Sequence, residues 1–339
     1  MSDFRRQSAD TAGHTAQPIR WTCAAPPADL PALRRWRAGV GPVRVGHAAP
    51  RGAAAGRAGR WPLSVAVWNA KVGDGAIRAL WDHLMREGAA AARPAVLLLQ
   101  EVFATGRDVA APTTTTTAWA SRIGPVPPGG PRADIVSFAR AAGLSLLYVP
   151  SMRNGHPARD PPEDRGNAIL ANVPLSAPRA IELPFERQRR VAVAADVTIA
   201  GTAITLCSIH LDNRSPWRRA WRTLGSARRR QMAGFLDVFP EDADTHPHVL
   251  GGDLNTWVAG RREGAYRLAR AGFPLPPRPD PRPTHHFEIG GWLRHSDHLM
   301  FRLPPGWHGE YHRLSDTYGS DHYPLVGTVE PAEGPETLK

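Results

Sequence analysis

Several apolar runs in this sequence end in polar side chains that are costly to bury. The polar groups that end or adjoin such runs are Asn69, Gln100-Glu101, His210, Asp253-Leu254-Asn255 and Ser320-Asp321-His322. A carboxylate beside buried strand ends is unfavourable unless it is paired or binds a cation. Oxygen and imidazole groups that converge at strand ends suit a hard divalent cation and a phosphate. The pattern therefore favours a sheet-based fold that gathers these groups at one rim.

The apolar periodicity predicts strands with interspersed helices. Residues 63–68 alternate as a strand does, and the continuous apolar run 95–99 is typical of a strand covered on both faces. Helical spacing appears between Ile77 and Met85, and residues 216–239 are expected to form the longest helix. We therefore expect one layered α/β domain over residues 61–330, followed by a solvated tail over 331–339.

Residues 1–60 differ in composition from the rest of the chain. They hold ten arginines against three aspartates, which is +7 of the net charge of +11. Ala, Gly and Pro dominate, so we expect a mostly disordered arm with a short helix near Leu30–Arg37. A nucleic-acid-binding arm and a leader without a specific role both fit this composition, and the second is the simpler interpretation.

The composition excludes several classes of protein. Two cysteines, Cys23 and Cys207, are too few for a disulfide scaffold or a cysteine-based zinc site. No apolar run reaches the roughly 18 residues that span a bilayer, so no membrane anchor is expected. The N-terminus lacks an apolar signal region, so a cytoplasmic location is the default expectation. Nothing in the sequence indicates an obligate protein partner.

Six short motifs occur in a fixed order along the chain. They are Trp68-Asn69, Gln100-Glu101, Gly166-Asn167-Ala168-Ile169-Leu170, His210-Leu211-Asp212, Gly252-Asp253-Leu254-Asn255 and Ser320-Asp321-His322. Together, over about residues 62–329, they resemble the endonuclease/exonuclease/phosphatase superfamily, which has the deoxyribonuclease I-like fold. The resemblance implies a four-layer α/β/β/α sandwich of two packed mixed β-sheets flanked by helices. It also implies hydrolysis of a phosphoester that depends on Mg²⁺, with Mn²⁺ as an alternative cation.

The resemblance implies roles in cation and substrate binding. Glu101 would be the principal metal ligand, with Asn69 beside it and Asp321 next to the metal. Asn167 would lie near the substrate, and Arg165, which precedes that motif, would reach a phosphate.

It also implies catalytic roles. Asp253 would orient or deprotonate the attacking water, and Asn255 would hydrogen-bond a phosphate oxygen. His210 would contact the phosphate or assist the leaving group. His322 would face the scissile phosphate, oriented by Asp297. No Ser or Cys nucleophile motif is evident, so we expect direct attack by water.

Three features leave alternatives open. The residues around Asp297 depart from the family pattern. Ser296 precedes Asp297, where the family more often has an apolar residue, and His298 follows it. His285 and His286 resemble a metal pair, but adjacent residues of an extended chain point apart, which favours a surface or substrate-loop role. The loop 104–133 has no obvious family counterpart and receives no role.

The net positive charge of the chain favours nucleic acid as the substrate, and hence a nuclease. The expected helix 216–239 is rich in arginine, which fits either a phosphate-tracking surface or a solvated helix face. A phosphohydrolase of lipid head groups or inositol phosphates, similar to sphingomyelinases, is the alternative on the same site. A non-catalytic binding module would lack ligands such as Glu101 and Asp253, both of which are present.

Overall fold

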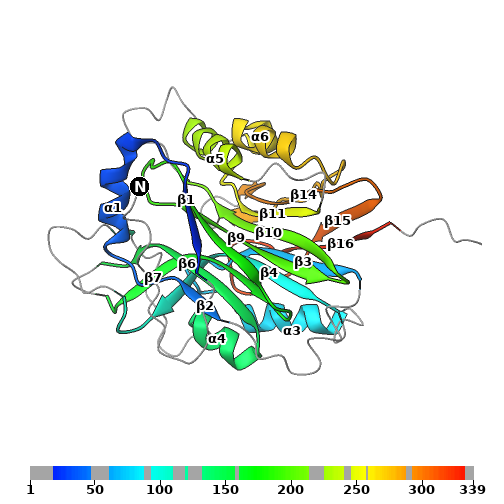
Figure 1. Cartoon of the computed structure of the whole chain (residues 1–339), viewed down its shortest axis with the longest axis horizontal. Helices are drawn as coiled ribbons and strands as arrows, with labels where there is room; N and C mark the ends of the chain where they lie inside the picture. Colours follow the sequence, from blue (N-terminus) through cyan, green and yellow to red (C-terminus); the bar gives the residue numbers. More distant parts are fainter. Residues whose placement is uncertain are drawn as a thin grey trace, which may run out of the picture.

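The computed structural model describes residues 18–46, 61–87, 93–109, 119–120, 132–156, 160–213, 225–239, 246–256, 259–287 and 292–332. Over these residues the chain forms four layers, in the order helix, sheet, sheet and helix (Figure 1). The predicted α/β/β/α sandwich of two mixed sheets is therefore confirmed.

Over the described ranges the first sheet has six strands, in the order β1-β8-β9-β10-β11-β14. Their bounds are β1 (Arg20–Cys23), β8 (Ser176–Glu182), β9 (Val191–Ile199), β10 (Thr202–His210), β11 (His248–Asp253) and β14 (Asp297–Arg302). β10 and β11 are parallel, whereas β9 and β14 run antiparallel to their neighbours.

The second sheet has the order β15-β16-β3-β4-β7-β6-β2, and β5 pairs with β6 at its edge. Their bounds are β2 (Arg44–Gly46), β3 (Leu63–Asn69), β4 (Ala95–Thr105), β5 (Trp119–Ala120), β6 (Ser145–Asn154), β7 (Glu163–Ala171), β15 (Trp307–Arg313) and β16 (Leu325–Pro331). The central strands β3 and β4 are parallel, and the apolar run 95–99 in β4 is covered on both faces, as expected.

Alternation along β3 shows how the sequence builds the layers. Val65 and Val67 pack into the core between the two sheets. Ala66 and Trp68 point the other way, into the core beneath the helices of the second sheet. Since successive strand side chains face opposite sides, one strand supplies two cores.

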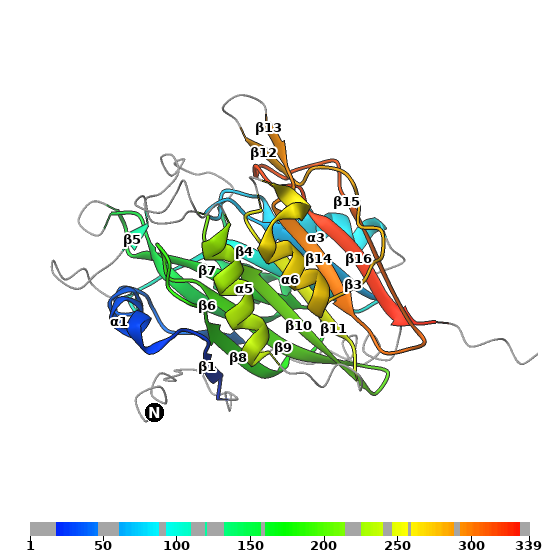
Figure 2. The same cartoon turned by 90° about the horizontal axis from the view of Figure 1, so that it is seen from above.

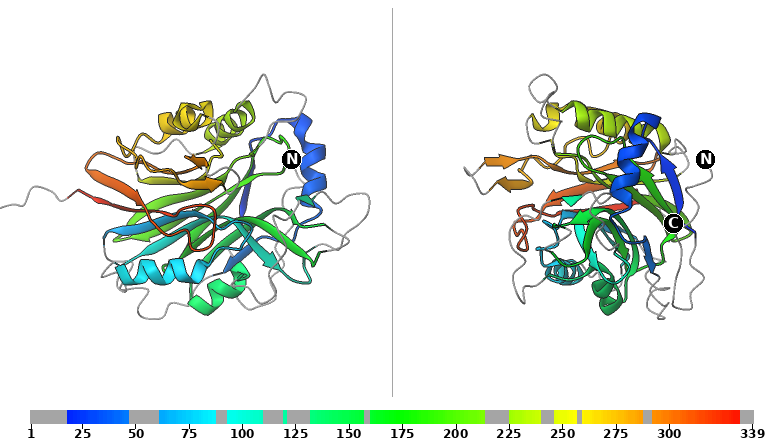
Figure 3. Two further views of the ribbon diagram at one scale, coloured as in Figure 1. Left: turned by 180° about the vertical axis from the view of Figure 1, so that it is seen from behind. Right: turned by 90° about the vertical axis from the view of Figure 1, so that its left-hand side faces the viewer.

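Four helices cover the outer faces of the sheets, as the end view also shows (Figure 3). They are α3 (Ile77–Glu87) and α4 (Ile135–Ala142) on the second sheet, and α5 (Ser226–Val238) and α6 (Gly264–Gly272) on the first. Asp134 caps the N-terminus of α4, where its side chain accepts the Ser137 N–H. Gly143 caps the C-terminus in the left-handed conformation.

The expected long helix 216–239 is shorter in the structure. α5 begins after Gly225, which has a φ of 86°, and residues 214–224 lie outside the described residues. Arg228 is buried in an ion pair with Glu263 (2.8 Å), so this arginine does not form a phosphate-tracking surface.

The expectation of a mostly disordered N-terminal arm is wrong for residues 18–46. The expected helix is present as α1 (Leu30–Arg37), and β1 and β2 join the edges of the two sheets. Trp36 of α1 packs with Met152 and Phe185. The strand partners of this segment lie at least 100 residues away, so no local sequence pattern predicts that it is ordered. Residues 1–17 and 47–60 lie outside the described residues.

We predict that Trp36→Ala lowers the free energy of unfolding by about 3–5 kcal/mol, because it removes the buried ring that anchors α1. Equilibrium unfolding in urea measures this change. Arg35→Ala is the matched control, since Arg35 is exposed on the same helix. A Trp36→Ala variant as stable as the Arg35→Ala control would show that α1 is not docked in solution.

A small hairpin projects from the sandwich beside the ends of the central strands (Figure 2). It consists of β12 (His285–Phe287) and β13 (Trp292–Arg294). Its backbone is joined to the segment before β16 by hydrogen bonds from His286 N to Asp321 O and from Tyr323 N to Thr284 O, both 2.8 Å. The described helices include none long and apolar enough to cross a membrane.

Candidate active site

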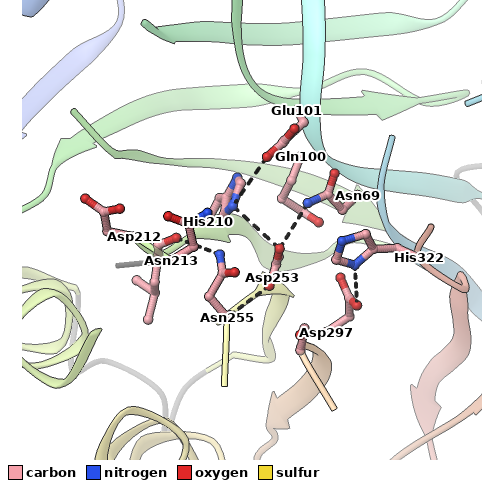
Figure 4. Close-up of polar contacts among 12 residues, drawn as sticks. Asn69, Gln100, Glu101, His210, Asp212, Asn213, Asp253, Asn255, Asp297 and His322 are labelled. Carbon is pink, nitrogen blue, oxygen red and sulfur yellow. Dashed lines mark hydrogen bonds and ion pairs between the residues drawn. The ribbon is translucent and has the colours of Figure 1, made fainter. Parts of the chain in front are cut away.

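The strand register of the first sheet places three of the expected catalytic residues in one row. His210 of β10 pairs with Asp253 of β11, and Asp253 pairs with Asp297 of β14. In the second sheet Asn69 pairs with Gln100, directly before Glu101. Figure 4 shows these side chains converging from both sheets.

Glu101 lies at a bulge in β4. The register between β4 and β7 shifts between Leu99 and Val102, and Glu101 has a φ of 54°. A bulge of this kind re-aims a side chain out of the regular alternation. Its Oε2 accepts the Val72 N–H (3.1 Å) and lies 3.4 Å from Arg165 Nη1. Its Oε1 lies 3.8 Å from His210 Nε2 and has no hydrogen-bond partner among the described residues.

The turn that supports Glu101 is itself strained. Val72 has a φ of 57°, which is unusual for a β-branched residue and persists only where the surroundings enforce it. Arg132 supplies that enforcement. Its Nη2 donates to Val72 O (2.7 Å), it is paired with Glu163 (2.9 Å), and it stacks 3.9 Å from the Phe103 ring. The loop 104–133, which received no role from the sequence, thus ends in a residue that shapes the site.

Asp253 is buried and held at both oxygens. Oδ2 accepts from Asn69 Nδ2 (3.0 Å), and Oδ1 accepts the Asn255 N–H (2.7 Å). Asn255 has a φ of 51°, so the chain bends sharply after Asp253. Burial and the neighbouring Asp297 carboxylate raise the pKa of Asp253 to about 6. A carboxyl group with such a pKa is suited to general base catalysis near neutral pH.

His322 and Asp297 form the pair that the resemblance implies. His322 Nδ1 lies 2.7 Å from Asp297 Oδ2, and both residues are buried. Burial alone would lower the pKa of His322, but Asp297, with Asp253 and Asp321, outweighs it and raises that pKa to about 10. The imidazolium is therefore the stable form at neutral pH. Trp68 Nε1 fixes the backbone by donating to His322 O (2.9 Å).

His285 joins the site, whereas its sequence position favoured a surface or substrate-loop role. Its ring lies 4.4 Å from that of His322, and its Nε2 lies 3.6 Å from Asp321 Oδ2. Hydrogen bonding from His285 and the charge of His322 outweigh burial and hold the pKa of Asp321 below its usual range. The hairpin that carries β12 brings His285 here, while His286 is exposed.

The residues expected to bind a metal have different neighbours in the structure. Asn69 Oδ1 accepts the Lys71 N–H (3.0 Å) while Nδ2 holds Asp253, so its amide positions the carboxylate. Asp321 lies beside His285 and His322. In the described part of the chain, two groups bring three ligand atoms within 4.8 Å of one another: Asp253-Asp297-His322 and His285-Asp321-His322.

The expected substrate-binding residues lie at the same end of the molecule. Arg165 is nearly buried beside Glu101, as given above. Asn167 Nδ2 donates to Val191 O (2.8 Å) and so ties β7 to β9 across the two sheets. Gly166 is required by packing, since a Cβ there would lie 2.0 Å from Val149 O. Their contacts with substrate stay predictions.

His298 is a structural residue, which removes the alternative to Asp297. It is buried, its Nε2 lies 2.9 Å from Thr256 Oγ1, and its ring packs 4.8 Å from that of Tyr266. Burial and the nearby Arg261 lower the pKa of His298 to about 3.

The donor set fits a divalent cation. Four carboxylates surround the site against two guanidinium groups, namely Glu101, Asp253, Asp297 and Asp321 against Arg165 and Arg190. The free Glu101 Oε1 is a hard oxygen ligand, and Mg²⁺ in proteins is held by one or two carboxylates and several waters.

We predict that Mg²⁺ raises the melting temperature at pH 7.5. A hundredfold excess of Mg²⁺ over its Kd adds about 2.7 kcal/mol to the free energy of unfolding. The folded pKa of Asp253 is raised to about 6, above its ordinary value of about 4, so the fold loses stability as pH rises from about 4 to about 6 and holds a buried charge above that range. A cation relieves this charge, so the stabilisation is smaller at pH 5. Calorimetry at matched ionic strength measures the rise in melting temperature at pH 7.5 and at pH 5. If Mg²⁺ raised the melting temperature of Glu101→Gln as much as that of the wild type, the assignment of Glu101 as a metal ligand would be contradicted.

The comparisons with known proteins agree with this geometry. The family model described as the Endonuclease/Exonuclease/phosphatase family matches residues 66–322. The comparison with curated protein sequences returns no match.

Solved structures with the same fold have little sequence identity with the chain. An endonuclease/exonuclease/phosphatase from Beutenbergia cavernae is 19% identical, with a TM-score of 0.55 over 82% of this chain and 74% of that one. A family protein from Leptotrichia buccalis is 14% identical, with a TM-score of 0.51 over 79% and 99%. A humanised D. rerio TDP2 is 16% identical, with a TM-score of 0.50 over 79% and 99%. With the family model matching most of the chain, the protein belongs to the endonuclease/exonuclease/phosphatase family.

Proposed function

We propose that this protein is a Mg²⁺-dependent phosphodiester hydrolase that acts on nucleic acid. One observation carries the proposal: Asp253, a buried carboxyl group with a pKa near 6, lies between two register neighbours, Asp297, which holds His322, and His210, whose Nε2 lies 3.8 Å from Glu101 of the other sheet. This arrangement combines a base, a cationic hydrogen-bond donor and a hard oxygen ligand.

The side chains divide the work of hydrolysis. Asp253 orients a water molecule and accepts its proton as the water attacks phosphorus. His322, held through Nδ1 by Asp297, presents its Nε2 proton to a phosphoryl oxygen or to the leaving oxygen. Asn255 hydrogen-bonds a phosphate oxygen. Bound at Glu101, Mg²⁺ supplies Lewis-acid stabilisation of the charge on the phosphoryl oxygens.

Charge supports nucleic acid as the substrate class. The chain carries a net charge of +11, which favours association with a polyanion. Arg165 and Arg190 add two cations at the site itself.

A substrate panel tests the proposal. Plasmid DNA, an abasic duplex, RNA, sphingomyelin and an inositol polyphosphate are each incubated with Mg²⁺ or with EDTA. We expect cleavage of a nucleic acid that EDTA and Asp253→Ala both abolish. Hydrolysis of only the lipid or the inositol phosphate would replace the nuclease with the alternative substrate class. Cleavage that survives both EDTA and Asp253→Ala would overturn the mechanism.

A further inference from the structure

We propose that Arg190 is a positioning residue that fixes His210 as a neutral imidazole with its proton on Nε2. Arg190 is 4% exposed and lies directly before β9. Its Nη1 lies 3.0 Å from His210 Nδ1. The catalytic consequence rests on the proposed function, whereas the tautomer itself does not.

The chemistry of the two groups determines the direction of this bond. A guanidinium has five N–H donors, no acceptor, and does not lose its proton in proteins. Nδ1 of His210 must therefore accept, with its lone pair directed at Arg190. An imidazole whose Nδ1 accepts carries its proton on Nε2.

The Nε2 proton points at the carboxylates of the site. His210 Nε2 lies 3.5 Å from Asp253 Oδ2 and 3.8 Å from Glu101 Oε1 (Figure 4).

His210 and His322 are therefore held in opposite ways. A carboxylate on Nδ1 keeps His322 charged, whereas a guanidinium on Nδ1 keeps His210 neutral. Neither nitrogen of His210 is then able to take up a proton, so it serves as a fixed hydrogen-bond donor. This excludes the proton transfer to the leaving group that the sequence left open for His210.

A chain of hydrogen bonds holds Arg190 in place. Its Nη2 donates to Gln188 Oε1 (3.1 Å), and Gln188 N and Arg187 N both donate to Asp212 Oδ2 (2.8 and 2.9 Å). Asp212 N in turn donates to Gln231 Oε1 on α5 (2.7 Å). Asp212 thus orients the loop that carries Arg190, and Arg190 in turn contacts His210, which belongs to the same motif as Asp212.

Nitrogen NMR tests the tautomer directly. In protein labelled with ¹⁵N-histidine, long-range ¹H–¹⁵N correlations distinguish a protonated from an unprotonated ring nitrogen, and His210→Asn assigns the His210 signals. We expect an unprotonated Nδ1 and a protonated Nε2 in the wild type at pH 7. Arg190→Met loses this pattern and Arg190→Lys, which keeps a donor, retains it. Arg187→Met is the matched control, since Arg187 is exposed in the same loop.

Kinetics measure the consequence. We expect Arg190→Met to lower kcat by about 10–100-fold with a smaller change in KM, and Arg190→Lys to recover part of the loss. A wild-type His210 protonated on Nδ1 would overturn the proposal, and this result needs no variant to fold. An Arg190→Met spectrum identical to the wild type would also overturn it. The expected tautomer in a protein that hydrolyses no phosphodiester would reject the proposed function and leave the positioning role in place.

Discussion

Asp253→Asn lowers phosphodiester hydrolysis by about 10²–10⁴-fold, because it removes the group that accepts a proton from water. The substitution keeps the shape of the side chain, and its oxygen still accepts the Asn255 N–H that Oδ1 accepts now. Its new amide group, however, faces Asn69 Nδ2, which donates to this position at 3.0 Å. The variant therefore loses one buried hydrogen bond besides the base.

Initial rates with a chromogenic phosphodiester measure the effect, and Asp237→Asn, on the exposed face of α5, is the matched control. The pH profile gives a second check. The pKa of Asp253 is raised to about 6 without a cation, so wild-type activity rises with pH and its acid limb lies at or below pH 6 when a cation is bound. Residual activity above one tenth of the wild type would remove Asp253 as the base.

Local sequence patterns predict the strands that carry the motifs, because apolar alternation is a property of neighbouring residues. The bend that aims Glu101 is different. It depends on the register shift between β4 and β7 and on Arg132, which reaches Val72 from the end of a loop. Neither contact has a local signal. The same holds for β1 and β2, whose pairing partners β8 and β6 lie far along the chain.

The sequence motifs missed Arg190, and the sequence left His285 with either a surface or a substrate-loop role. One signal for Arg190 did exist. β9 and β10 are neighbours in sequence and pair antiparallel, which brings the start of β9, next to Arg190, beside the end of β10, at His210. His285 had no comparable signal, since the hairpin it belongs to lies beside the site through contacts with Asp321 and Tyr323.

Asp297→Asn lowers hydrolysis by about 10²–10³-fold, because His322 loses the partner that keeps it charged and oriented toward the phosphate. Without the Asp297 carboxylate, the strongest effect that opposes burial is lost, and the pKa of His322 falls from its value of about 10. A neutral His322 that rotates about its side chain no longer presents a fixed Nε2 proton. His286→Gln, an exposed neighbour of the site, is the control for the assay.

Stability against pH separates this effect from simple misfolding. The folded pKa of His322 lies above that of a free histidine, so its contribution to stability is present in full below about pH 6.5. That contribution is lost as the pH rises toward 10. We therefore expect the melting temperature of the wild type to fall over this range, and that of Asp297→Asn to fall less. Parallel curves for the two proteins would show that Asp297 does not set the charge of His322, and its role would then be limited to packing.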